Sequence, residues 1–338
     1  ARRQTTAASG FEDQSCRTDD LVLAYLGVWA RPAGLAAMAS HADEYPCLGT
    51  EDNAEIWCNS SPGMEAVVNV FGAYVLIGYA AGALVYFCLV TGDWARANAY
   101  VFLTFAALCV WSHLKTMLTD PGAVPRDAIA ATEDDAKVDG FCAKCDRYKP
   151  SKAYHCSKCK RCVSRMDHHC PYTNNCVGAK NQKHMVLFLI YCNLQAVYAL
   201  ALVAYYGGYR GYLYDEGWLA LALTALLGLD GGMTLLFTGT MCRRQVISMR
   251  TGIGTIDRLK LAKGKPIAGG TPIPLSSIFG HTVLFWPLPL DPDFPPDVEA
   301  EILGFRCPRV ADEHREPLWR PVSQETGLLS GEERKEPA

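Results

Sequence analysis

Eight cysteine and histidine residues between positions 142 and 176 repeat with a period of fourteen residues. The first quartet is Cys142, Cys145, His155 and Cys162, and the second is Cys156, Cys159, His169 and Cys176. Both follow the spacing C-x2-C-x9-H-x6-C. Three sulfurs and one imidazole are the ligand set of a closed structural zinc site, and a C-x2-C pair can direct both sulfurs at one metal. The sequence therefore predicts two structural Zn²⁺ ions.

Three residues within the span of the second quartet have no role in either quartet. They are Asp167, His168 and Cys170. A thiol next to an imidazole can act as a nucleophile, because the imidazole takes its proton and a carboxylate can orient the imidazole. We therefore expect Cys170 to be a catalytic nucleophile, His168 its base and Asp167 the orienting group. Asp167 could instead hydrogen-bond to zinc-bound His169, since neighbours in sequence need not touch.

Four long apolar runs flank the cysteine-rich segment, at residues 67–90, 94–118, 185–206 and 218–241. Each is long enough to cross ~30 Å of hydrocarbon at about 1.5 Å per residue. Charged residues make up 20% of the chain, and most of them lie outside these runs. We therefore predict an all-α polytopic membrane protein. Its four transmembrane helices carry a cytosolic two-zinc cysteine-rich domain between the second and third spans.

The expected domains follow these runs. They are an N-terminal region (1–63), transmembrane helices one and two (64–118), the zinc-binding domain (119–184), transmembrane helices three and four (185–242) and a C-terminal region (243–338) whose end is partly disordered. A weaker apolar stretch at 21–39 is interrupted by Arg31-Pro32 and is expected to form a soluble or interfacial helix pair. Lys and Arg crowd the zinc domain and the segment after 242, which places both termini and the zinc domain in the cytosol. The cytosol also keeps thiols reduced.

Two other functions are compatible with parts of this pattern. A membrane-anchored zinc-binding adaptor, such as a ubiquitin-ligase-like module, would have both quartets. It would not need a free thiol at Cys170. A metal transporter would need polar ligands inside the spans, where Asp230 is the candidate. An intramembrane carboxylate is either functional or hydrogen-bonded at a kink, and Gly231-Gly232 beside it leaves both readings open. The net charge of -3 gives no reason to expect a nucleic-acid partner.

The segment Asp167-His168-His169-Cys170 matches the signature of the DHHC-type protein palmitoyltransferases, and the chain resembles that family over about 105–285. Other matching segments are Lys149-Pro150, Asp120-Pro121-Gly122 and Asn174-Asn175-Cys176-Val177-Gly178. Residues 117–125 and Ile278-Phe279-Gly280-His281 resemble the Golgi-associated branch in particular. The resemblance implies that a long-chain acyl-CoA acylates Cys170, which passes the acyl group to cysteines of substrate proteins. It also implies an acyl chain bound among the spans of a Golgi or other endomembrane protein. Lys and Arg residues within 149–183 are candidates to bind the CoA phosphates.

The chain departs from the family pattern at several positions. Tyr172 stands where the family usually has Trp, Met185 where it often has Phe, and Pro274 where related chains have Asn. The threonine- and glutamate-containing motif after the fourth span appears only as Gly254-Thr255-Ile256-Asp257. These changes leave the expected metal ligands and the nucleophile in place.

Overall fold

The computed structural model describes residues 64–90, 92, 94–125, 127–133, 140–209, 217–267 and 270–306. All of them belong to the unit Ala42–Ala338. The expectations for the N-terminal region, for its helix pair at 21–39 and for the end of the chain after 306 lie outside the described residues.

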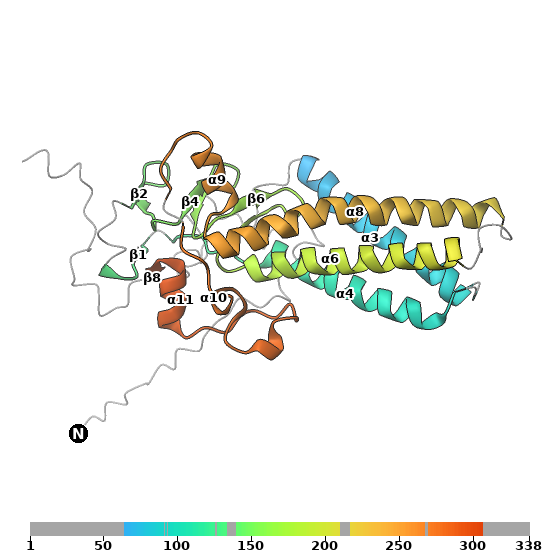
Figure 1. The fold of residues 1–338 in the computed structure, drawn as a ribbon. Helices are drawn as coiled ribbons and strands as arrows, with labels where there is room; N and C mark the ends of the chain where they lie inside the picture. The colour runs from blue at the N-terminus through green and yellow to red at the C-terminus, as the bar shows by residue number, and fades with distance from the viewer. Residues whose placement is uncertain are drawn as a thin grey trace, which may run out of the picture. The chain divides into compact units, whose positions relative to one another are not determined.

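Four long helices form a bundle in this part of the chain. They are α3 (Met64–Val85, continued by the π-helical turn η2, Tyr86–Val90), α4 (Arg96–Leu118), α6 (Gln182–Leu202, continued by η3, Val203–Tyr209) and α8 (Trp218–Thr251). Within the described ranges, these are the four helices that are long and apolar enough to cross a membrane. Helix α6 packs between α4 and α8, and α3 contacts both α4 and α8 (Figure 1).

The helices are apolar on nearly all sides, so large side chains also face outward. Phe71, Leu229 and Leu236 are exposed on the surface of the bundle, which suits a surface covered by lipid. At the end of the bundle away from the cysteine-rich segment, Trp94 stacks between Phe87 and Tyr206 with ring centroids 4.7 Å apart on each side. This aromatic stack closes the core there.

The fourth helix is longer than the predicted span. It continues ten residues past Met241 to Thr251, which is about 15 Å at the rise of an α-helix. Gly252 then ends it with φ 65°, a left-handed conformation that glycine adopts without steric cost. Because residues 242–251 are mostly polar, apolar length alone could not predict this extension. It carries Gln245 to the cysteine-rich segment.

The all-α class is wrong for the segment between the second and third long helices. Its strands pair as three antiparallel hairpins: β2 (Phe141–Cys142) with β3 (Arg147–Tyr148), β4 (Tyr154–Cys156) with β5 (Arg161–Val163), and β6 (His168–Cys170) with β7 (Asn175–Val177). Strands of two or three residues are too short to show the alternation of polar and apolar residues that predicts a strand. A fourth pair joins β1 (Ile129–Ala130) to β8 (Phe305–Arg306).

The C-terminal segment returns to the same end of the bundle as the hairpins (Figure 1). It forms α9 (Thr255–Leu261), α10 (Ser276–Phe279), the 3-10 turn η4 (Val283–Phe285) and α11 (Pro296–Leu303). Asp291 binds Lys115 at the end of α4 and His184 at the start of α6, at 2.6 and 3.0 Å. These contacts hold the returning segment against the helix ends that carry the hairpins.

Candidate functional site

The first predicted metal quartet comes together in space. The Nδ1 atom of His155 lies 3.7 Å from the sulfur of Cys142 and 3.1 Å from that of Cys145. The sulfur of Cys162 lies 3.8 Å from that of Cys145. Four ligands at zinc bond lengths in a tetrahedron stand about 3.4–3.8 Å apart. The donor atoms and their spacing therefore fit Zn²⁺.

The second quartet has the same arrangement. Nδ1 of His169 lies 3.7 Å from the sulfur of Cys156, 3.3 Å from Cys159 and 3.8 Å from Cys176. In each quartet all four ligand atoms are within 4.8 Å of one another, so each set could hold a metal ion. The structure thus brings all eight predicted ligands together in their two predicted sets.

The three residues outside the repeat also meet. Nδ1 of His168 lies 2.8 Å from Oδ2 of Asp167, and His168 interacts through a hydrogen bond with the thiol of Cys170. Because Asp167 engages Nδ1, Nε2 of His168 is the atom that can exchange a proton with the thiol. Of the two neighbouring histidines, it is His168 that the carboxylate contacts.

These contacts shift the pKa values of all three groups. Burial raises the pKa of Cys170, but the hydrogen bond and positive charge of His168 outweigh it, so that pKa lies below its usual value. Burial lowers the pKa of His168, but hydrogen bonds with Asp167 and Cys170 raise it to about 10 overall. Burial also raises the pKa of Asp167, and bonds from His168 and Thr255 bring it below its usual value. At neutral pH these directions favour a Cys170 thiolate beside a His168 imidazolium.

Two residues that hold Asp167 were not among the predicted site residues. Thr255 donates its backbone N–H to Oδ1 at 2.7 Å and its hydroxyl to Oδ2 at 3.1 Å. Gln245, on the extension of α8, donates Nε2 to Oδ2 at 2.9 Å. The remnant motif around Thr255 was the only sequence signal for this support. Gln245 gave none, because a single polar residue beyond a span is unremarkable.

The third hairpin is anchored to the end of α4. The side-chain amide of Asn175 donates to the carbonyls of Thr116, Met117 and Thr119, at 3.1, 3.2 and 3.0 Å. Carbonyls in the last turn of a helix have no hydrogen-bond donor within the helix. The Asn175 amide supplies a donor to these carbonyls at the end of α4. The ring of His113, also on α4, lies 3.0 Å from the carbonyl of Tyr172. These contacts fix the position of the hairpin, and of Cys170 on it, relative to α4.

The thiol itself faces apolar surroundings. Cys170 is 3% exposed and packs in one cluster with Cys109 of α4, Met185 and Leu189 of α6, and Met249 of α8. It therefore lies where the hairpin meets the interior of the helix bundle.

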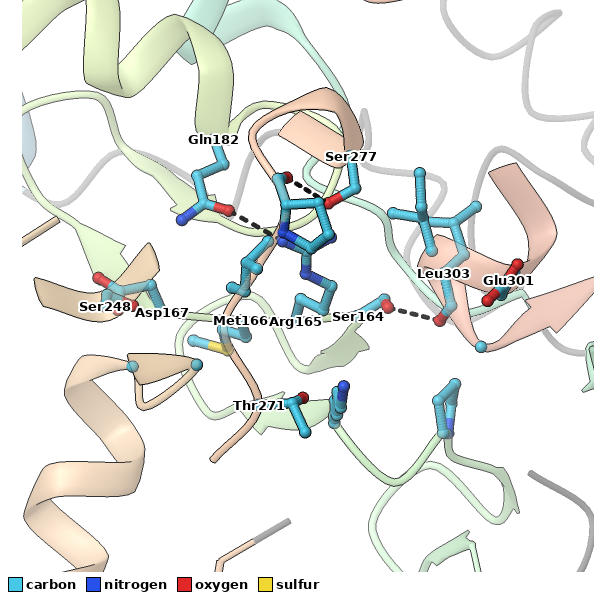
Figure 2. A pocket seen from close by; sticks show the side chains of 18 of the residues that line it. Ser164, Arg165, Met166, Asp167, Gln182, Ser248, Thr271, Ser277, Glu301 and Leu303 are labelled. Carbon is cyan, nitrogen blue, oxygen red and sulfur yellow. Dashed lines mark hydrogen bonds between the residues drawn. The ribbon is translucent and has the colours of Figure 1, made fainter. Parts of the chain in front are cut away.

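A cavity of about 370 Å³ adjoins the support of His168. Its wall includes residues 164–167, the end of α8, the segment 271–277 and α11. Arg165 donates a hydrogen bond to Oε1 of Gln182 at 3.4 Å. Figure 2 shows this pair, with Asp167 further along the wall. Burial lowers the pKa of Arg165 to about 10, so it is a cation at neutral pH.

The fold and site define a protein with four membrane-capable helices, whose thiol–imidazole pair is carried by a cysteine-rich domain with two sets of residues that could each hold a metal ion. The DHHC palmitoyltransferase family model matches residues 136–262. Palmitoyltransferase ZDHHC3 of Rattus norvegicus is 35% identical over 228 residues, which are 62% of this chain and 75% of that protein. The human protein of that name is 34% identical over 201 residues (54% of this chain and 66% of that protein). Palmitoyltransferase ZDHHC7 of Mus musculus is 37% identical over 180 residues (49% and 58%).

The chain belongs to the DHHC palmitoyltransferase family. The resemblance carried by residues 167–170 is thus confirmed, and with it the expectation of an enzyme of the acyltransferase class. The matches span 58 to 75% of the length of these three relatives.

Proposed function

We propose that this protein is a protein S-acyltransferase that uses long-chain acyl-CoA, forms a thioester on Cys170 and passes the acyl group to cysteines of substrate proteins. The observation that carries the proposal is the arrangement of Cys170, His168 and Asp167 on a hairpin that packs against the membrane helices. The relatives named as palmitoyltransferases support it.

The first step forms the acyl-enzyme. The Cys170 thiolate attacks the carbonyl carbon of acyl-CoA, and the bond between that carbon and the CoA sulfur breaks. The departing CoA thiolate takes the proton of the His168 imidazolium, which leaves His168 neutral. Asp167 keeps the ring turned toward the thiol, since it binds Nδ1 at 2.8 Å.

The second step releases the acyl group. The neutral His168 accepts a proton from the substrate cysteine as that sulfur attacks the thioester. The bond to Cys170 then breaks, and its thiolate again pairs with the imidazolium. Exchange of one thioester for another is nearly thermoneutral, so the enzyme mainly needs a good nucleophile and a positioned acyl chain.

The apolar cluster around Cys170 supports a place for that chain among the spans. Each methylene removed from water contributes about 0.8 kcal/mol, so binding a long chain gives ample energy for orientation. The two zinc ions would hold the hairpins that carry the thiol, through the quartets that end at Cys162 and Cys176. A chain segment with so little apolar core depends on its metals for folding.

The excess of Lys and Arg in the zinc domain and after α8 supports a cytosolic position for both, with both termini on the same side. The proposed site then faces cytosolic acyl-CoA and the cysteines of membrane-associated substrates. We place the protein in the Golgi or another endomembrane, and we retain the domain boundaries predicted from the sequence.

Intact-mass analysis after incubation with palmitoyl-CoA tests the proposal. One hydroxylamine-labile acyl group should appear, and Cys170→Ser should remove both it and transfer to substrates. Cys242→Ser is the matched control, because Cys242 is a partly buried thiol of α8 near the same cluster. Transfer that survives in Cys170→Ser would place the nucleophile elsewhere. If the protein were a zinc-binding adaptor, neither the wild type nor the Cys242→Ser control would be acylated.

A further inference from the structure

The three hairpins of the cysteine-rich segment share one register. In the first hairpin Cys142 pairs with Arg147, and in the second Cys156 pairs with Arg161. In the third, Cys170 pairs with Asn175. Each pair follows the previous one by fourteen residues, so Cys170 occupies the position at which the other two hairpins place the first ligand of a metal quartet.

The turns of the hairpins agree as well. Asp146, Lys160 and Asn174 end the three turns with φ values of 52°, 52° and 45°. Such positive values are uncommon for residues other than glycine, so their return at the same position shows that the turns close in the same way. The sulfur contacts also correspond. The backbone N–H of Cys159 lies 3.3 Å from the Cys156 sulfur, and that of Thr173 hydrogen-bonds to the Cys170 thiol.

The third hairpin differs from the others at the second ligand. Where the first two carry Cys145 and Cys159, the third carries Thr173. The two remaining ligand positions of a third quartet would fall at Lys183 and Ile190, inside α6. The repeat therefore ends because the chain enters a membrane helix, and the thiol of Cys170 is left without the three partners that a full quartet would give it.

Part of a metal site nevertheless remains at this hairpin. His168 offers an imidazole to the same thiol, and its other ring nitrogen binds Asp167 at 2.8 Å. A carboxylate on the far nitrogen is the usual setting of a zinc-bound histidine. Zinc sites with three protein ligands and one open position are common in enzymes. One more sulfur at position 173 would complete such a set.

We infer that Thr173 is a specificity-determining residue that keeps Cys170 free of metal. Its hydroxyl is a neutral, weak ligand for zinc compared with a thiolate, and its side chain is 1% exposed. The third hairpin thus has the turn of a metal-binding hairpin and two of the three protein ligands of an open zinc site. Because the third ligand is missing, the Cys170 thiol stays available for acyl transfer. The inference rests on the proposed role of Cys170 only for the statement about transfer, because the geometry of the hairpin stands without it.

The test is the zinc content of the purified full-length Thr173→Cys protein. Wild-type protein should carry two zincs per chain, one for each quartet. Thr173→Cys should carry a third and lose about 10²–10⁴-fold in autoacylation, the range for loss of a general acid–base group. Thr173→Ser is the matched control and should keep two, since it retains a hydroxyl. If Thr173→Cys does not fold, Thr173→His offers a nitrogen ligand at the same place and should also take up a third zinc.

The double variant Thr173→Cys/Cys170→Ser shows whether the added metal uses the nucleophile. It should return to two zincs. A folded Thr173→Cys protein with two zincs would overturn the inference, and so would a third zinc that persists in the double variant. Because metal content is measured without acyl-CoA, these results stand whether or not Cys170 proves to be the acylated residue.

Discussion

Thr255 binds the Asp167 carboxylate twice, through its backbone N–H at 2.7 Å and its hydroxyl at 3.1 Å, across 88 residues of sequence. A Cβ added at the neighbouring Gly254 would approach Oδ1 of the same carboxylate to 3.0 Å. The orientation of His168 is therefore set from two sides: the third hairpin carries Asp167, and the start of α9 holds it. The two metal quartets alone do not complete this site.

Loss of the Thr255 hydroxyl should weaken the hold on Asp167 without disturbing the metals. A hydrogen bond to a charged group contributes about 1.5–3 kcal/mol, and partial loss of this effect in Thr255→Val should slow single-turnover autoacylation by about tenfold. The acid limb of its pH–rate profile should also shift to higher pH. Thr240→Val is the control, because that hydroxyl binds a carbonyl of its own helix. An unchanged rate and profile would show that Thr255 does not position Asp167.

The two adjacent histidines should separate in their effects. His168→Ala should keep both zincs and normal thermal stability and lose about 10²–10⁴-fold in autoacylation, the range expected for a general acid–base group. His169→Ala should lose zinc, stability and activity together, because its Nδ1 completes the second quartet. Elemental analysis and thermal unfolding on the same preparations check this. Metal loss in His168→Ala with retention in His169→Ala would reverse the two assignments.

The rate of autoacylation should be bell-shaped in pH. The reaction needs the thiolate, whose pKa lies below the usual value for cysteine because of His168, so the rate falls as acid protonates Cys170. It also needs the proton of His168, whose pKa is raised to about 10. The imidazolium loses this proton as the pH rises past that value, so the rate falls again at high pH. In His168→Ala the acid limb should shift to higher pH, toward the pKa of an ordinary cysteine thiol. A profile that rises steadily past pH 10 would contradict the role of the imidazolium.

The two metal quartets and the contact between Cys170 and His168 could be predicted because their signals are local. The ligands of each quartet lie within 21 residues of sequence and follow the same spacing, and Cys170 belongs to neither set. The partners of Asp167 could not be predicted in the same way. Gln245 and Thr255 are 78 and 88 residues from it and belong to no periodic pattern. Only the folded chain brings them to the hairpin.

The boundaries of the elements show the same limit. Apolar length located the four membrane-capable helices, since a span must be apolar along its length. It could not predict that α8 continues to Thr251, because tertiary contacts such as those of Gln245 stabilise that part of the helix. The hairpins were missed for a related reason: their strands have only two or three residues, so they show no alternation of polar and apolar side chains.

Asp291 offers a test of how the C-terminal segment is held. Its carboxylate binds Lys115 at 2.6 Å and His184 at 3.0 Å. Burial raises the pKa of Asp291, but the bonds from His184 and Lys115 outweigh it and bring that pKa below its usual value. A depressed carboxyl pKa means that the contribution to stability is fully present above about pH 4 and is lost as the pH falls below it. Measurement at neutral pH therefore captures all of it.

Asp291→Asn should lower the free energy of unfolding by at most about 1 kcal/mol at pH 7, because the Asp291 side chain is 61% exposed and solvent weakens the ion pair. Zinc content should stay at two per chain, since neither quartet contacts this residue. Asp293→Asn is the control, because Asp293 is an exposed carboxylate two positions away in the same segment. Thermal unfolding in detergent compares the two variants. Equal stability of both would show that the ion pair with Lys115 and the bond to His184 do not hold the segment in place.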